Sequence, residues 1–209
     1  MKNTIAIALF LVSSIAFAQG PYEKGMQKAL QLWGEGKTAD ASNMFERIAN
    51  AEMDNWLPYY YVAQINTIIS FGEKDKEKLT QQLEKAQEYI DLAKNISPDN
   101  PEILVQQAMT HTAWIAFDGA TYGMTLSGKV AALYAKALEI APENPRVVFS
   151  KAEWDMGSAR YFGQDTTPYC KDVSRSLELF DTFKAESDFH PNWGKDRAAS
   201  VLSTLCGKE

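Results

Sequence analysis

The chain has 209 residues, of which 45% are hydrophobic and 23% charged, and its formal net charge at pH 7 is −6. The hydrophobic fraction is large enough for a buried core, which excludes an intrinsically disordered chain. The acidic balance argues against nucleic acid and anionic membrane surfaces as partners, because both recruit clusters of Lys and Arg.

The first 18 residues have the features of a secretory signal peptide. Lys2 provides a basic start, the stretch from Ile5 to Phe17 is mostly apolar, and Ala16 and Ala18 are the small residues that a cleavage site needs. The apolar run is shorter than the roughly 20 residues that cross a bilayer. We therefore expect an exported protein, periplasmic or secreted, that is not a lipoprotein and has no membrane insertion after cleavage. An uncleaved N-terminal anchor is the alternative.

From Pro21 to Glu209 the apolar residues recur with the period of an α-helix, and no stretch alternates as a strand would. An alanine marks the same position of successive candidate helices, and an asparagine that can cap the first turn precedes three of them. An aromatic residue shortly before a glycine ends several of these helices. The recurring residues are Ala29, Ala63, Ala108, Ala152 and Ala198; Asn55, Asn100 and Asn144; and Gly34, Gly72, Gly119 and Gly163.

These repeats resemble the tetratricopeptide (TPR) family, whose helix-turn-helix unit of about 34 residues carries small and aromatic residues at set positions. The first unit fits the pattern without a gap, at Ala29, Gly36, Ala41, Phe45 and Ile48. The resemblance implies an all-α, right-handed superhelical solenoid of about four helix-turn-helix repeats plus a C-terminal capping helix. The expected domain spans 19–209, with repeats at approximately 22–55, 56–99, 100–143 and 144–190 and the capping helix at 191–206.

The later units carry extra residues between their helices, and the stretches Ala120–Lys129 and Gln164–Cys170 are predicted to be loops. Part of the first stretch, Gly123–Val130, nearly matches a phosphate-binding loop. However, Val130 stands where that motif needs Ser or Thr to bind magnesium, and the stretch follows a helix instead of a strand. We therefore interpret it as a glycine-rich connection without a bound nucleotide.

The two cysteines are Cys170 and Cys206. An exported chain meets an oxidising environment, where an even number of cysteines favours a disulfide. The second helix of the fourth unit is expected to run from near Cys170 to about Glu186, and the capping helix to return antiparallel beside it. Cys206 would then lie next to Cys170, so we expect a disulfide between them. Two free, partly buried thiols are the alternative.

No catalytic or metal-binding motif is recognisable in the sequence. The two histidines, His111 and His190, lie far apart, and neither belongs to a His-x-x-x-His or Glu-x-x-His set. No Ser or Cys lies in a hydrolase-like elbow. We therefore expect a protein that is not an enzyme and that uses neither a metal nor a cofactor.

In the TPR family the first helices of successive repeats line a concave groove, and the resemblance implies which positions of each helix face it. The combination of apolar anchors and directional polar groups at these positions suits an extended or helical peptide. The expected groove residues are Tyr60, Gln64, Thr67, Met109, Thr112, Phe149, Glu153 and Met156. Met and aromatic residues at helical spacing are more often core residues, and this alternative stays open.

The expected function is that of a non-enzymatic scaffold or adaptor in the cell envelope or outside the cell. Such a protein would bind another protein or a peptide in its concave groove. An accessory subunit or a self-associating assembly module is the alternative, and a small-ligand binder or an enzyme is a third, less favoured class.

Overall fold

The computed structural model describes residues 20–207, and within this range the chain is all-α, without a strand. The predicted signal peptide, 1–18, lies outside the described residues. No helix in the described range is both long and apolar enough to cross a membrane. The helices are α1 (Pro21–Gly34), α2 (Thr38–Ala51), α3 (Trp56–Ser70), α4 (Lys76–Ile96), α5 (Pro101–Phe117), α6 (Gly119–Ile140), α7 (Pro145–Tyr161), α8 (Cys170–Thr182) and α9 (Lys195–Val201).

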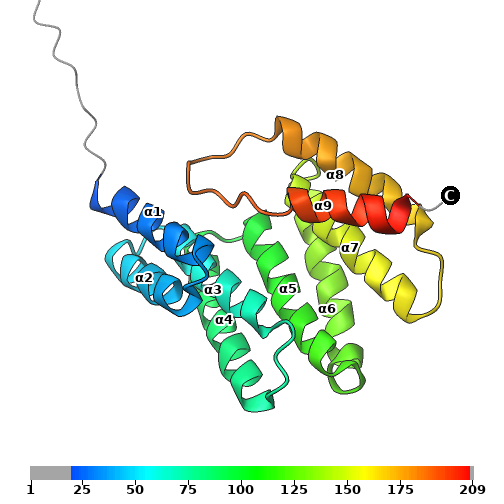
Figure 1. The fold of residues 1–209 in the computed structure, drawn as a ribbon, viewed down its shortest axis with the longest axis horizontal. Helices are drawn as coiled ribbons and strands as arrows, with labels where there is room; N and C mark the ends of the chain where they lie inside the picture. The colour runs from blue at the N-terminus through cyan, green and yellow to red at the C-terminus, as the bar shows by residue number, and fades with distance from the viewer. Residues whose placement is uncertain (1–19, 208–209) are drawn as a thin grey trace, which may run out of the picture.

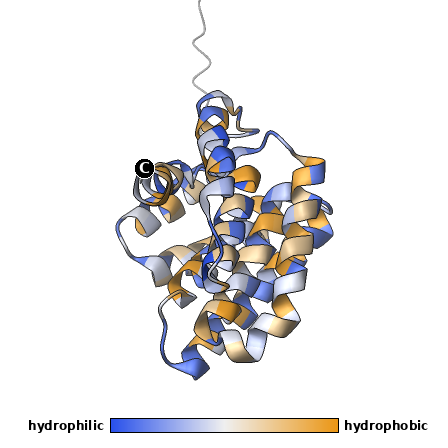
Figure 2. Ribbon diagram, turned by 90° about the vertical axis from the view of Figure 1, so that its right-hand side faces the viewer, coloured by the Kyte–Doolittle hydropathy of each residue, from blue (hydrophilic) through white to orange (hydrophobic). Residues whose placement is uncertain are grey.

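The helices pack in sequential pairs, α1 with α2, α3 with α4, α5 with α6 and α7 with α8, and α9 lies against α8 (Figure 1). Apolar and polar stretches alternate around most of the helices, as expected where each helix buries one face (Figure 2). The five recurring alanines are all buried, which lets neighbouring helices approach closely. These features confirm the predicted all-α helical-repeat fold.

The predicted asparagine caps are confirmed at α3, α5 and α7. The side-chain oxygen of Asn55 accepts a hydrogen bond from the Leu57 backbone N–H at 3.0 Å. Asn100 and Asn144 accept from the corresponding N–H groups of their own helices, each at 2.9 Å. In α5 and α7 a proline follows the cap directly and occupies the first helical position, where its missing N–H costs nothing.

The sequence predicts a loop over Ala120–Lys129, and this prediction is wrong, because the stretch forms the first half of α6. Asp118 caps the new helix immediately after α5 ends, and its carboxylate accepts from the backbone N–H and the hydroxyl of Thr121 at 3.0 and 2.6 Å. The sequence that resembles a phosphate-binding loop is therefore helical, and its N–H groups are used within the helix.

Helix α3 is enclosed by its neighbours, and every side chain from Leu57 to Thr67 is buried. Helix α2 packs on one flank, where the rings of Phe45 and Tyr61 stack with their centroids 4.9 Å apart. Helices α4 and α5 pack on other flanks. Because α3 is covered on several sides, it forms the centre of the N-terminal half of the molecule.

The C-terminal part of the chain forms a hairpin of α8, an irregular connection and α9. We call this connection, residues 183–194, the strap. Helix α8 ends at Thr182, about one turn earlier than predicted, and the predicted capping helix 191–206 begins only at Lys195. Gly194 has a φ of +109°, and a Cβ atom there would lie 2.9 Å from a ring atom of α8. This glycine therefore allows the strap to turn sharply into α9.

The expected disulfide is present between Cys170, at the start of α8, and Cys206, at the end of the π-helical turn Leu202–Cys206 that follows α9. The two Cα atoms are 5.7 Å apart. The bond joins the two ends of the hairpin, so α8, the strap and α9 all lie within one covalently closed loop.

Candidate functional site

The predicted groove is not an open surface in this structure. Five of the eight predicted groove residues are buried, so these five cannot contact a ligand in this conformation; they are Tyr60, Gln64, Thr67, Phe149 and Met156. The other three are half-buried, namely Met109, Thr112 and Glu153. The expectation that all eight face an open groove is therefore wrong.

The chain's own C-terminal hairpin covers the groove-facing side of α3 and α7. The indole N–H of Trp193, in the strap, donates to the Tyr60 hydroxyl at 2.7 Å. On α7, the half-buried Glu153 accepts from Arg197 of α9 at 2.7 Å. Phe149 belongs to an apolar cluster that includes residues of α8 and α9. The C-terminal hairpin thus covers Tyr60 and part of α7, whereas Thr67 is buried against α5 through hydrogen bonds with Thr110 and Gln106.

The strap reaches across the molecule to the N-terminal helices. In Figure 1 it extends from α8 toward α1 and α3 before it returns to α9. The Tyr61 hydroxyl donates to the Phe189 carbonyl at 2.8 Å, and the Phe189 ring meets Tyr22 edge-on at a centroid distance of 5.6 Å. Burial raises the pKa of Tyr60 and of Tyr61, so both hydroxyls stay protonated in these hydrogen bonds.

An open cleft of about 780 Å³ lies where the N-terminal ends of α5 and α7 meet α8 and the strap. Its lining combines aromatic, apolar, cationic and acidic side chains from segments far apart in the sequence. The lining includes Trp56, Glu102, Asn144, Arg175, Leu179, Phe183, Lys184 and His190.

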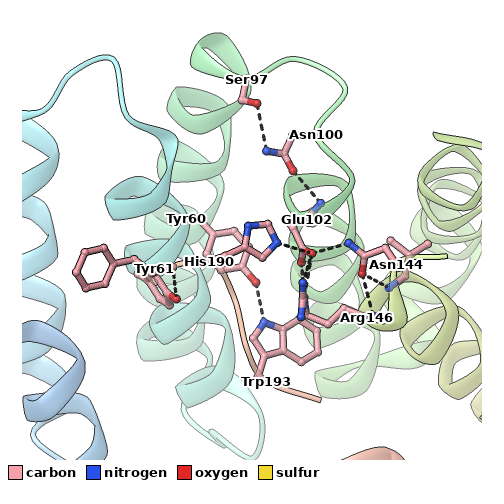
Figure 3. A network of polar contacts seen from close by, with 11 residues as sticks. Tyr60, Tyr61, Ser97, Asn100, Glu102, Asn144, Arg146, His190 and Trp193 are labelled. Carbon is pink, nitrogen blue, oxygen red and sulfur yellow. Dashed lines mark hydrogen bonds and ion pairs between the residues drawn. The ribbon is translucent and has the colours of Figure 1, made fainter. Parts of the chain in front are cut away.

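A buried carboxylate forms the base of the cleft. Glu102 and Arg146 are each 1% exposed. The Arg146 guanidinium donates from Nε to both Glu102 oxygens, at 2.9 and 2.8 Å, and from Nη2 to Oε1 at 2.6 Å (Figure 3). The Asn144 amide adds a donor at 2.6 Å. Burial alone would raise the pKa of Glu102, but the neighbouring His190, the hydrogen bonds from Arg146 and Asn144 and the arginine charge outweigh it and lower this pKa.

His190 forms part of the wall between this carboxylate and the cleft. It is 6% exposed, and its Nε2 atom lies 3.4 Å from Oε1 of Glu102. Both ring nitrogens are buried, and neither has a hydrogen-bond partner in the described part of the chain. The Trp56 and Phe183 rings lie next to the imidazole, with centroid distances of 6.1 and 5.6 Å. The imidazole therefore has two aromatic neighbours and its Nε2 atom near a fixed carboxylate.

The rim of the cleft carries exposed charges of both signs. Arg175 on α8 and Lys184 on the strap are the exposed cations, and Arg175 also donates to the Pro142 carbonyl at 3.0 Å. Glu143 and Glu186 are the exposed acids. The N-terminal ends of α5 and α7, which favour negative charge, open onto the same space. The cleft therefore combines partly apolar walls with a rim of mixed charge.

The sequence carried a signal for part of this site. Glu102 and Arg146 each follow the proline that begins a helix, so they occupy equivalent positions in two successive repeats and have opposite charges. Their pairing across the repeat boundary could have been predicted from that equivalence. For His190, which lies in the strap outside the periodic pattern, no such signal existed. Among residues 20–207 no group of three or more His, Cys, Asp or Glu side chains is arranged to hold a metal ion.

No protein-family model and no curated protein matches this chain. Among solved structures, the chain is similar to the HusA haemophore from Porphyromonas gingivalis, with a TM-score of 0.78 and 23% sequence identity over 90% of this chain and 95% of that one. Weaker similarity is found to the MamA RS-1 ArsTM double mutant (TM-score 0.49, 12% identity, 78% of this chain and 76% of that one). It is also found to TTC0263, a thermophilic TPR protein in Thermus thermophilus (TM-score 0.42, 14% identity, 87% and 99%). The chain therefore has the fold of the HusA haemophore over nearly its whole described length.

Proposed function

We propose that this protein is an exported, non-enzymatic carrier that binds a porphyrin, with haem as the natural cargo, in the cleft at the N-terminal ends of α5 and α7. The observation that carries the proposal is the cleft itself. Its volume of about 780 Å³ lies in the range of small-molecule sites, and its lining combines aromatic and apolar side chains with polar and charged ones.

The walls and rim of the cleft fit the chemistry of a porphyrin. The macrocycle is flat and apolar, and Trp56, Phe183 and Leu179 offer surfaces against which it can pack. Haem also carries two carboxylates, and Arg175 and Lys184 are placed at the rim to pair with them.

Two observations outside the cleft support the same function. The similar solved structure from Porphyromonas gingivalis is that of a haemophore, and the likeness extends over almost all of both chains. The predicted signal peptide and the disulfide favour a protein that acts outside the cytoplasm, where a carrier would meet haem. A small-ligand carrier, the less favoured class from the sequence alone, becomes the preferred one because the groove for a peptide is filled.

The proposal is tested by equilibrium titration of the mature protein with ferric haem, followed by quenching of tryptophan fluorescence. We expect saturable binding of one haem per chain, and the double variant Arg175→Ala/Lys184→Ala to bind at least about tenfold more weakly, because it loses two charge-assisted contacts. The matched control, Lys94→Ala/Arg160→Ala, removes two basic residues outside the cleft and should bind as the wild type does. Absence of saturable binding to the wild type would refute the proposal.

A protein partner is a second candidate, favoured by a set of exposed apolar side chains at the ends of helices away from the strap. Tyr161 and Phe162, where α7 ends, are 77% and 69% exposed, and Phe71 and Met124 are 43% and 94% exposed. Exposed apolar groups of this size often mark contact sites. A protein that co-purifies in equal amount with the wild type, and that is lost in Tyr161→Ser/Phe162→Ser while haem binding is unchanged, would favour this candidate.

A further inference from the structure

We propose that residues 184–188 of the strap form a flap that closes over the bound ligand, and that an acidic ligand closes it through Lys184. This inference rests on the proposed function and assigns the regulation of the same site. It is carried by two features of the structure. The strap has an anchored and an unanchored half, and the two cations of the cleft rim lie on a packed helix and on the unanchored half.

The strap is fixed on both sides of the flap. On one side, the Arg146 guanidinium lies over the Phe183 ring, with its Cζ atom 4.7 Å from the ring centroid. On the other side, residues 189–191 are buried. The Tyr61 hydroxyl donates to the Phe189 carbonyl there at 2.8 Å. These contacts hold the ends of the flap against α7 and α3.

The flap itself has few contacts that hold it. Residues 184–188 are all exposed. Within residues 20–207 their backbone makes a single hydrogen bond to another backbone group, in which the Ser187 carbonyl accepts from the His190 N–H at 3.1 Å. No ion pair in the same range involves Lys184, Glu186 or Asp188. Segments with exposed backbone and few buried contacts open at a low cost in free energy, so the flap is the part of the cleft wall that moves most easily.

The two cations of the rim are held differently. Arg175 belongs to α8 and donates to the Pro142 carbonyl at 3.0 Å, so its position is set before a ligand arrives. Lys184 lines the same cleft from the flap. A ligand carboxylate that pairs with Lys184 binds the closed flap better than the open one, and this difference shifts the equilibrium toward closure. A carboxylate that pairs with Arg175 has no such effect, because Arg175 does not move with the flap.

Closure should slow the release of the ligand, because the flap must open again before the ligand leaves. We therefore expect Lys184→Ala to increase the dissociation rate of a porphyrin about two- to fivefold, the effect of losing one exposed ion pair. Stopped-flow displacement of the bound porphyrin by an excess of apomyoglobin measures this rate.

The movement is tested by electron paramagnetic resonance of a nitroxide label, with metal-free protoporphyrin as the ligand. Ala185→Cys places the label in the flap, and Asn192→Cys is the matched control, because Asn192 is also exposed but lies in the anchored half. In the free protein we expect a mobile label at position 185 and a restrained one at position 192. Protoporphyrin should restrain the label at 185 and leave the label at 192 unchanged.

The role of Lys184 is tested in the same labelled protein. With Lys184→Ala, protoporphyrin should bind while the label at position 185 stays mobile. With Arg175→Ala, the matched control at the rim, the bound porphyrin should still restrain the label. Protoporphyrin dimethyl ester, which carries no carboxylates, should leave the label mobile even when both cations are present.

The outcomes separate the flap from the carrier function. A label at 185 that is as restrained as the one at 192 in the free protein would overturn the flap while the carrier function stands. If bound protoporphyrin restrains the label equally in Lys184→Ala and Arg175→Ala, the assignment of Lys184 is overturned. If the unlabelled protein binds neither protoporphyrin nor ferric haem, the carrier function fails, and ligand-driven closure fails with it.

Discussion

Glu102 and Arg146 form a buried ion pair that connects α5 to α7, two helices of successive repeats. Removing one partner of such a pair leaves an uncompensated buried charge, which costs about 3–5 kcal/mol. We therefore predict that Glu102→Met and Arg146→Met each lower the free energy of unfolding by about 3–5 kcal/mol. The double variant should lose much less than the sum of the two, because no unpaired charge remains. Urea unfolding of the four proteins gives these values.

The matched control for this cycle is Lys136→Met, which breaks a surface ion pair. Lys136 pairs with Asp99, and both side chains are largely exposed. Exposed pairs of this kind contribute about 0–1 kcal/mol, so the free energy of unfolding should change little. If the losses of Glu102→Met and Arg146→Met simply add in the double variant, the two residues do not act as a pair in solution.

At the scale of single residues, the sequence was informative wherever the structure depends on local interactions. Asn55, Asn100 and Asn144 were predicted as caps, because a cap bonds to its own helix within three residues. The pairing of Glu102 with Arg146 depends instead on how two repeats stack, so this buried ion pair was not predicted. The role of His190 depends on a contact between the strap and α5, which no local pattern encodes.

At the scale of elements, helix α6 shows why a glycine-containing stretch was misassigned. Gly123 and Gly128 each lower helix propensity by about 1 kcal/mol relative to alanine, which suggested a loop. In the structure, Asp118 starts the helix at once, and the later part of α6 is held by buried Val130 and Tyr134. Tertiary packing together with a strong cap therefore outweighs the local preference.

The hairpin of α8, the strap and α9 owes part of its stability to the disulfide. Cys170 and Cys206 are 36 positions apart, and closing a loop of this length restricts the unfolded chain by about 3–4 kcal/mol. We predict that Cys170→Ser/Cys206→Ser lowers the free energy of unfolding by about that amount. Denaturant unfolding of the variant and of the oxidised and reduced wild type measures it.

The reduced wild type is the internal control for the serine variant, because both lack the bond. Their unfolding free energies should agree within the error of the extrapolation. An oxidised protein no more stable than the reduced one would contradict the assignment of a stabilising role to this disulfide. A large difference between reduced protein and serine variant would show that the serine side chains disturb the hairpin themselves.

At the scale of the whole molecule, the stacking of helix pairs could be predicted, but the covering of Tyr60 by the C-terminal hairpin could not. Periodicity and recurring alanines encode contacts between neighbouring repeats, and these are present in the structure. The strap has no period, and the hydrogen bond from Tyr61 to Phe189 joins residues 128 positions apart. No local sequence pattern predicts a contact between residues so far apart in the chain. The covering of Tyr60 and the cleft beside it are therefore visible only in the structure.

The proposed ligand site is the cleft between the strap and the N-terminal ends of α5 and α7. Amide hydrogen exchange, measured by mass spectrometry with and without saturating ferric haem, tests it most directly. Haem should slow exchange in the strap, residues 183–194, and in the first turns of α5 and α7. Slower exchange confined to the C-terminal ends of α3 and α7, where Phe71, Tyr161 and Phe162 are exposed, or no change at all, would contradict it.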